Sequence, residues 1–536
     1  MDRRRFLSLG TAGVAIAAGG RWSPAAAAAS SADRGRESLF GLGVASGEPA
    51  VDGFVLWTRL VRDVLAPDGG MGVAPVPVHW QVGSDERCGR VVARGTFIAT
   101  LDDAHSVHAV VAGLRPGRPY WYRFRVGNGV SAIGRARTLP AWHERGRLRL
   151  ITAADASYSE SLFPAYEAVT AEEDLDVVVF LGDYIYDDDP SLRGKTVLRR
   201  DTTPEGPPFD QLTTLTDYRR RHAVYKTDPL LQAAHAAAPW IAVPDDHEVE
   251  DNYAGLDDVE DRDKPTHSDR DAFARQRAAA YKAYWEHLPF RPEARPVGAS
   301  MRLHRSFTFG RLAALHMLDT RQFRQHPALF VPGNYGPEVL GRTNPGTMLG
   351  AEQEAWLTAS VAATRSSRWQ LLGQQVAMMQ ARLINPAGAN PPTLFAYDQW
   401  DGFGPARTRL LSGLAAAGLE HLVVLTGDVH AAAAGDLRVD FDAPDSPIVG
   451  SELITTAIST GTMGDANYAV LSASNPRFNP HVRYLDRFNG YLRITIEAEQ
   501  LLAEYRQVAS ITERSSPVTT RSTWVIDHDG GRLRRV

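Results

Sequence analysis

The pattern of apolar and polar residues changes near residue 146, and it predicts a different kind of structure on each side. Between about residues 40 and 140, short β-rich or alternating stretches are separated by clusters of Asp, Gly and Pro. Such a pattern is typical of short strands joined by tight turns. We expect four of these strands at residues 55–58, 78–82, 107–111 and 120–126.

The turn before the last of these strands is the most specific feature of this segment. The sequence Leu114-Arg-Pro-Gly-Arg-Pro leads directly into Tyr120-Trp-Tyr122. This arrangement resembles the tyrosine corner of fibronectin-type and Ig-like sandwiches, in which a tyrosine hydroxyl binds nearby backbone. We therefore expect a small all-β sandwich domain over residues 38–140, with Trp80 in its core.

From residue 146 onward, continuous apolar runs alternate with helical patterns. Apolar runs of this kind suit strands that are buried on both faces of a sheet. They cover residues 148–152, 177–181, 240–243, 312–318, 369–372 and 422–425. Helical patterns lie between them at residues 163–172, 271–287, 351–363 and 406–414. We expect an α/β (α+β) domain over residues 146–536, with layered sheets flanked by helices.

Each of the six runs is followed by polar residues. They are Asp155; Asp183; Asp245, Asp246 and His247; Asp319 and Arg321; Gln374 and Gln375; and Asp428 and His430. In open α/β sheets, ligands bind beyond the carboxyl ends of the strands. One aspartate there is usually a turn or cap residue, but several converging carboxylates repel each other unless a cation neutralises them. The strand ends therefore predict a metal cluster.

The residue types at these ends indicate hard cations. Asp183 could bridge two metals about 3.5–4 Å apart, and Tyr186 follows it closely in the sequence. Because the pKa of free tyrosine is about 10, a phenolate ligand at neutral pH needs a strong Lewis acid such as ferric iron. The alternative for Tyr186 is an ordinary surface or core aromatic. Asp428 and His430 add a carboxylate and an imidazole, and so oxygen-rich a set suits calcium beside a single ferric centre.

Three roles are open for His247, which stands in the acidic turn Asp245-Asp246-His247-Glu248. It could be a metal ligand, a hydrogen-bonded core histidine, or the group that donates a proton to a leaving oxygen. We expect the last of these, because a histidine beside a metal cluster suits general acid catalysis.

The N-terminal residues have the three-part layout of an export signal. Arg3, Arg4 and Arg5 precede Phe6-Leu7, an apolar run follows at 9–20, and small residues at 25–29 offer a cleavage site. Paired arginines before Phe-Leu resemble the twin-arginine signal. A basic amphipathic helix fits less well, because the basic residues all precede the apolar run. We expect residues 1–29 to be read by the twin-arginine export machinery, which would place the protein in the periplasm, cell wall or medium.

Composition narrows the classes of function. The 58 basic and 63 acidic residues give a net charge of -5, which argues against nucleic-acid binding as the main role. No apolar run reaches the roughly 20 residues of a membrane-spanning helix. A single cysteine, Cys88, excludes an intrachain disulfide and a cysteine-based zinc cluster.

The motifs, taken in order, resemble one family. "GDYIY", "PWIAVPDDHEVEDNYAG", "LDTRQFR" and "LTGDVHAA" look like the PhoD-type alkaline phosphatases. The resemblance implies a metallophosphatase core like that of purple acid phosphatases, with Fe³⁺ and Ca²⁺ activating a hydroxide that attacks phosphorus. It also implies that Asp183 is the bridging ligand and Tyr186 an iron ligand. By the same resemblance, Asp246 stands at the Asn of the common "GNHE" motif, and Asp428 and His430 stand for the final His-x-His pair.

The sequence departs from the family pattern after the first strand of this domain. Family members typically carry a cysteine ligand there in an "SCQ" context, whereas this chain has Ala154-Asp155-Ala156. An aspartate at this position is similar to the purple acid phosphatases, so we expect Asp155 to be a metal ligand. Without a thiolate, thiolate-to-metal charge transfer cannot occur.

These observations predict a secreted metal-dependent alkaline phosphatase that hydrolyses small phosphomonoesters, with phosphodiesters as further candidate substrates. A phospholipase D-type phosphodiesterase on the same fold is the first alternative. A non-catalytic exported binding protein is the second. The second alternative would predict degenerate strand ends, and the intact set of acidic residues and histidines argues against it.

Overall fold

The computed structural model describes residues 38–144, 146–187, 197–199, 212–257, 269–326, 335–385, 393–417, 419, 422–443, 445–528 and 532–536. The predicted export signal at 1–29 lies outside these residues. Within the described part of the chain, no helix is both long enough and apolar enough to cross a membrane.

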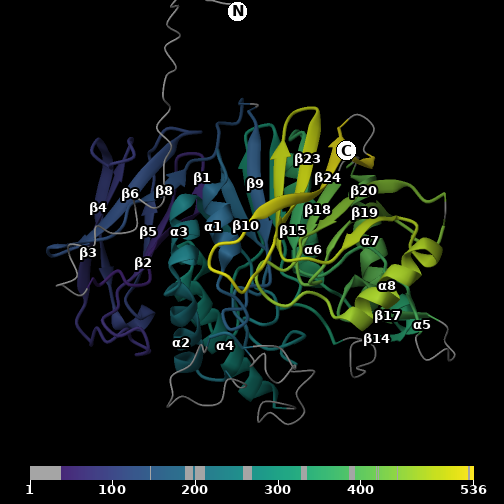
Figure 1. Ribbon diagram of the computed structural model, residues 1–536, viewed down its shortest axis with the longest axis horizontal. Helices are drawn as coiled ribbons and strands as arrows, with labels where there is room; N and C mark the ends of the chain where they lie inside the picture. Colours follow the sequence, from purple (N-terminus) through teal and green to yellow (C-terminus); the bar gives the residue numbers. More distant parts are fainter. Residues whose placement is uncertain are drawn as a thin grey trace, which may run out of the picture.

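Two large mixed sheets form the centre of the molecule (Figure 1). The first has ten strands in the order β25 (Leu533–Arg535), β24 (Val518–Asp527), β23 (Gln500–Val508), β22 (Gly490–Ile496), β9 (Leu148–Ala153), β10 (Val177–Phe180), β11 (Pro239–Ala242), β1 (Val44–Ala50), β2 (Gly53–Arg59) and β5 (Ser106–Val111). The second has seven strands in the order β12 (Arg305–Phe309), β13 (Ala313–Met317), β15 (Trp369–Gln374), β18 (Leu422–Thr426), β20 (Ile448–Ile454), β19 (Ala432–Arg438) and β21 (Val482–Asp486). A small third sheet consists of β14 (Tyr335–Pro337), β17 (Thr393–Ala396) and β16 (Leu383–Ile384).

The six predicted apolar runs are among the parallel strands of the two large sheets. In the first sheet, β9, β10 and β11 run parallel, and in the second, β13, β15 and β18 do so. Every residue of β10, β11, β13, β15 and β18 is buried. The prediction of strands covered on both faces is therefore confirmed.

The two sheets pack face to face and carry helices on their outer faces. Alternate residues of β15 show this arrangement. Leu371 belongs to the core shared with β9 and β10, whereas Leu372 packs in a second core with helices α6 (Gly350–Thr364) and α7 (Gly404–Ala416). The core is thus four layers deep, with one layer of helices outside each sheet, as the predicted α/β (α+β) class requires.

The predicted helices are present, with ends close to those expected. They are α1 (Pro164–Ala171), α4 (Arg270–His287), α6 (Gly350–Thr364) and α7 (Gly404–Ala416). The structure adds α2 (Leu215–Lys226), α3 (Pro229–Ala237), α5 (Glu338–Thr343) and α8 (Asp465–Phe478). Local signals start two of these: Thr214 and Asp217 form a capping box at α2, and Asp228 caps α3 just before Pro229.

The N-terminal domain is a sandwich, and the four strands predicted there are β2, β3 (Val76–Gly83), β5 and β6 (Pro119–Val126). Strands β4 (Val91–Ala99), β3, β6, β7 (Gly129–Val130) and β8 (Gly134–Arg137) form one sheet, which packs on β1, β2 and β5. The tyrosine corner is confirmed, because the Tyr120 hydroxyl donates to the Arg115 carbonyl at 3.2 Å and accepts from its N–H at 3.0 Å.

The prediction of Trp80 as a core tryptophan holds only in part. Its side chain is only partly buried and packs against the edge of the domain core, whereas Trp57 of β2 is fully buried. The Trp80 ring lies over Gly95 of β4, where a Cβ would come within 2.4 Å of it. A glycine on the neighbouring strand thus gives this ring a groove on the sheet surface.

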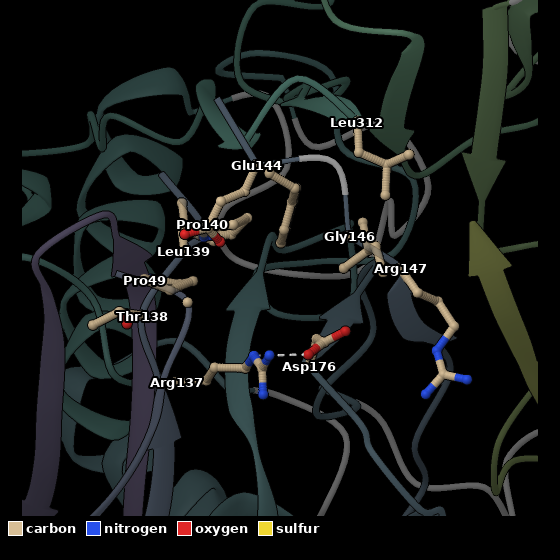
Figure 2. A pocket seen from close by; sticks show the side chains of 13 residues that line it. Pro49, Arg137, Thr138, Leu139, Pro140, Glu144, Gly146, Arg147, Asp176 and Leu312 are labelled. Atoms are coloured by element: carbon tan, nitrogen blue, oxygen red, sulfur yellow. Dashed lines mark ion pairs between the residues drawn. The ribbon is translucent and has the colours of Figure 1, made fainter. Parts of the chain in front are cut away.

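The two predicted domains share one continuous sheet. Strand β1 pairs in parallel with β11, with Gly47 opposite Trp240, so the sheet of the N-terminal domain extends the sheet of the core. At Gly47 a Cβ would lie 2.5 Å from the Trp240 carbonyl oxygen. Figure 2 shows the connecting segment at 138–140 beside the ion pair of Arg137 and Asp176. Nε of Arg137 is 2.8 Å from Oδ1 of Asp176. The domain boundaries at 140 and 146 stay a prediction.

Candidate metal centre

The polar strand ends converge on one place. Three overlapping groups of residues have ligand atoms that all lie within 4.8 Å of one another. They are Asp155, Asp183 and His430; Asp183, Asp246 and His247; and Asp245, Asp246 and Asp428. Asp183 and Asp246 each belong to two groups. The sequence analysis predicted six metal ligands and one proton donor, and these groups contain all of them except Tyr186. The grouped residues come from the ends of four strands, which belong to both sheets.

The backbone turns sharply at these positions. Asp155, Asp183, Asp428 and His430 all have positive φ, between 56° and 64°. Such left-handed conformations cost about 1–3 kcal/mol for residues other than glycine and cluster at functional sites. Gly182 has φ of 113°, and a Cβ there would lie 2.4 Å from the Cβ of Asp245. The close approach of the β10 and β11 strand ends therefore requires glycine at this position.

Tyr186 joins the first group. Its hydroxyl oxygen is 3.1 Å from Nε2 of His430, which in turn is 3.5 Å from Oδ1 of Asp155. Nδ1 of His430 donates to the carbonyl of Gly461 at 2.7 Å. Because Nδ1 carries the proton, Nε2 has a lone pair that points toward Tyr186 and Asp155.

The residues present fit a cation. Asp155 is fully buried, and neither of its carboxylate oxygens has a hydrogen-bond partner among the described residues. Oδ1 of Asp246 and Oδ2 of Asp245 are likewise buried without a partner there. Buried charges in proteins are paired or coordinate metals, since an isolated one is costly. Oxygen and imidazole donors in this number suit a hard cation such as calcium or ferric iron.

The electrostatics of the protein atoms lead to the same conclusion. Burial raises the pKa of Asp155 well above its ordinary range, and the charges of Asp428 and Asp246 raise it further. Burial also raises the pKa of Asp183, and the neighbouring carboxylates act in the same direction. Like charges gathered in a buried site favour the protonated acids unless a cation is present.

Glu248 holds two of the strand ends together. Its carboxylate accepts hydrogen bonds from the N–H groups of Asp183 at 3.1 Å, Tyr184 at 2.6 Å and Asp245 at 2.8 Å. The loops after β10 and β11 are thereby fixed to one buried side chain. Sequence reasoning named Glu248 only as a member of the acidic turn.

Sequence reasoning also missed the role of Arg321, although it noted this residue after the fourth strand. Arg321 is 1% exposed and forms ion pairs with Asp245, with Asp398 at 2.8 Å and with Asp428 at 3.1 Å. Burial alone would raise the pKa of Asp246, but Arg321 and the other partners hold it below its ordinary value. A single arginine among strand ends that carry mostly carboxylates was the feature of the sequence that could have revealed this role. Asp398 carried no such signal, since it follows no predicted strand.

His247 lies between carboxylates. Its Nδ1 donates to Oδ1 of Asp187 at 2.6 Å, and its Nε2 is 3.7 Å from Oδ1 of Asp251. The ring centroid is 4.3 Å from that of Tyr186. The contact with Asp187 fixes the orientation of the ring. The only cysteine, Cys88, is buried in the N-terminal domain with Sγ 3.5 Å from the Trp121 carbonyl, so it supplies no ligand here.

Comparisons with known proteins agree with this geometry. Residues 150–505 match the PhoD-like phosphatase family, and residues 25–140 match the N-terminal domain of PhoD-like phosphatases. Alkaline phosphatase D of Bacillus subtilis (strain 168) is 39% identical over 502 residues, covering 93% of this chain and 82% of that protein.

Two solved structures are similar to this chain in fold. The structure of PhoD superposes with a TM-score of 0.83 at 37% identity, covering 94% of this chain and 93% of that one. The purple acid phosphatase PPD1 from yellow lupin (Lupinus luteus) has the same fold at 12% identity, with a TM-score of 0.51 over 89% of this chain and 73% of that one. The chain therefore belongs to the PhoD-like phosphatase family and is a phosphoric ester hydrolase.

Proposed function

We propose that this enzyme is an exported, metal-dependent alkaline phosphatase that hydrolyses small phosphomonoesters at the cluster of strand ends. The observation that carries the proposal is the fully buried Asp155 carboxylate, which has no hydrogen-bond partner among the described residues and lies within the cluster. The similarity to alkaline phosphatase D of Bacillus subtilis supports the reaction class. Export rests on the layout of residues 1–29.

Two sets of residues would hold the cations. Asp155, Tyr186 and His430 would hold one cation, for which we propose Fe³⁺, and Asp246 and Asp428 would hold Ca²⁺. Asp183 is grouped with Asp155 and His430 and also with Asp246, and it would be shared between the two cations. When bound, these cations supply Lewis acidity, which activates water as a nucleophile and offsets charge on the phosphate.

The protein residues then have separate tasks. Glu248 and Arg321 keep the carboxylates in place, so little reorganisation is needed during the reaction. Asp187 fixes the His247 ring through a hydrogen bond to Nδ1. We propose that His247 donates a proton to the leaving oxygen of the ester.

A pair of matched variants tests the proposal. Asp183 follows strand β10, whereas Asp176 directly precedes it and is paired with Arg137. We expect Asp183→Asn to lose metal by elemental analysis and to lose activity on an aryl phosphomonoester by several orders of magnitude. Asp176→Asn removes a carboxylate at the opposite end of the same strand, and we expect it to keep both.

Substrate class is read in the same assay by comparing an aryl phosphomonoester with the matching phosphodiester. Higher turnover of the diester by the wild-type enzyme would favour the phospholipase D-type alternative. Wild-type protein that is active without metal, or an Asp183→Asn variant with normal metal content and turnover, would overturn the metal-dependent proposal.

A further inference from the structure

The segment at 457–463, which follows β20, contacts two of the proposed ligands. The N–H groups of Ser459 and Thr460 both donate to the carbonyl of Asp155 at 3.2 Å. The N–H of Met463 donates to the carbonyl of His430 at 2.9 Å. One stretch of backbone thus joins the loop after β9 to the loop after β18, which lie in different sheets.

The same segment orients the imidazole of His430. The carbonyl of Gly461 accepts the Nδ1 proton at 2.7 Å, and this leaves Nε2 facing Asp155 and Tyr186. In metal sites, the partner of the other ring nitrogen commonly fixes the tautomer and direction of a histidine ligand. The position of the Gly461 peptide therefore decides where Nε2 points.

Glu160 binds the backbone on the N-terminal side of this carbonyl, through the Gly461 N–H and the Thr460 side chain. One carboxylate oxygen accepts from the Thr460 hydroxyl at 2.8 Å, and the other accepts from the Gly461 N–H at 2.8 Å. Glu160 is 8% exposed, and hydrogen bonds to a carboxylate are roughly twice as strong as those between neutral groups. On the other side, the Asn489 side chain donates to the Thr460 carbonyl at 2.6 Å.

We propose that Glu160 is a positioning residue for His430. Its carboxylate fixes the Thr460-Gly461 backbone, the Gly461 carbonyl fixes the imidazole, and the imidazole then presents Nε2 to the metal. This inference rests on the proposed function, because it takes His430 to be a ligand. Glu160 lies outside the strand-end cluster, and by this proposal it also contributes to metal affinity.

Metal retention tests the proposal. We expect Glu160→Ala to bind metal about 10-fold more weakly than wild type, at the low end of the range for residues that support a ligand. Affinity is measured by competition with a chelator, with bound iron and calcium counted by elemental analysis. Glu160→Gln keeps one acceptor oxygen, so we expect it to recover part of the loss.

Glu172 supplies the matched control. Its side chain is 6% exposed and binds the Tyr491 hydroxyl at 2.7 Å and Arg493 at 2.6 Å, none of which belongs to the metal centre. We expect Glu172→Ala to lower the melting temperature as Glu160→Ala does, while leaving metal affinity unchanged. A purely structural role for Glu160 would make the two variants behave alike.

The His430→Ala variant distinguishes failure of the proposed function from failure of the proposal about Glu160. If wild type retains no metal, or if His430→Ala retains it fully, the proposed function fails at this residue. If His430→Ala loses metal while Glu160→Ala binds it as tightly as wild type does, the proposed function stands and the role of Glu160 is refuted.

Discussion

Removing the Asp155 carboxylate should change stability in opposite directions with and without metal. The group is fully buried and has no hydrogen-bond partner among the described residues. A buried polar group left unsatisfied costs about 1–3 kcal/mol. Asp155→Ala removes that cost but leaves a small void, so we take the low end, about 1 kcal/mol of net stabilisation in the metal-free protein.

The same change should weaken the response to metal. Loss of a direct ligand should cost at least the roughly 10-fold in affinity that a supporting residue costs. When metal exceeds its dissociation constant, a tenfold weaker affinity removes about 1.4 kcal/mol of the stabilisation that binding provides. The variant should therefore be more stable than wild type without metal and should gain less when metal is added.

The assay is calorimetry at pH 8 on protein stripped with a chelator and on protein reloaded with Fe³⁺ and Ca²⁺. At about 2.1 cal/mol/K of unfolding entropy per residue, 1 kcal/mol moves the melting temperature of a domain of this length by about 1 °C, so the metal-free variant should melt roughly 1 °C higher. If Asp155 only caps a turn, alanine costs about 1 kcal/mol in both states. An equal drop in melting temperature with and without metal would refute its role as a ligand.

Three further predictions concern export, charge balance and pH. Replacing Arg4 and Arg5 by Lys keeps the charge but removes the guanidinium pair, so precursor should accumulate uncleaved inside the cell; normal secretion would contradict the twin-arginine signal. Arg321→Met leaves Asp245 and Asp428 without their buried partner and should destabilise the metal-free protein by about 3–5 kcal/mol, with metal recovering part of the loss; an unchanged unfolding curve in denaturant would exclude this role. Because the pKa values of Asp155 and Asp183 are raised in the fold, their contribution to stability is full below the unfolded pKa of about 4 and is lost as the pH rises above it; calorimetry of metal-free protein from pH 4 upward should show this fall, and added metal should reduce it.

Much of the core could be predicted from the sequence, because local pattern and burial are tightly linked in this fold. The run at 177–181 has no polar residue, so it can lie only where both faces are covered, and β10 does lie there. Aspartates that directly follow neighbouring parallel strands lie at the same edge of a sheet. This is why Asp155, Asp183 and Asp246 could be named in advance, although their roles as ligands stay predictions.

Individual side chains were less predictable where the environment depends on a neighbouring strand. Trp57 and Trp80 both stand in β-rich stretches of the N-terminal domain, and the sequence pattern predicts Trp80 as a core residue. Trp57 is fully buried, whereas Trp80 is only partly buried and its ring lies over Gly95, which is opposite it on β4. Such pairing cannot be read from either strand alone.

The sequence by itself determined which segments are buried and which strand ends carry carboxylates, since both follow from the order of apolar and polar residues over a few positions. Only the tertiary structure decided how those ends are held. Arg321 meets Asp245 across 76 positions, and Glu160 reaches Gly461 across 301. Contacts between such distant residues depend on how the two sheets pack against each other, and no short-range pattern in the chain encodes that packing.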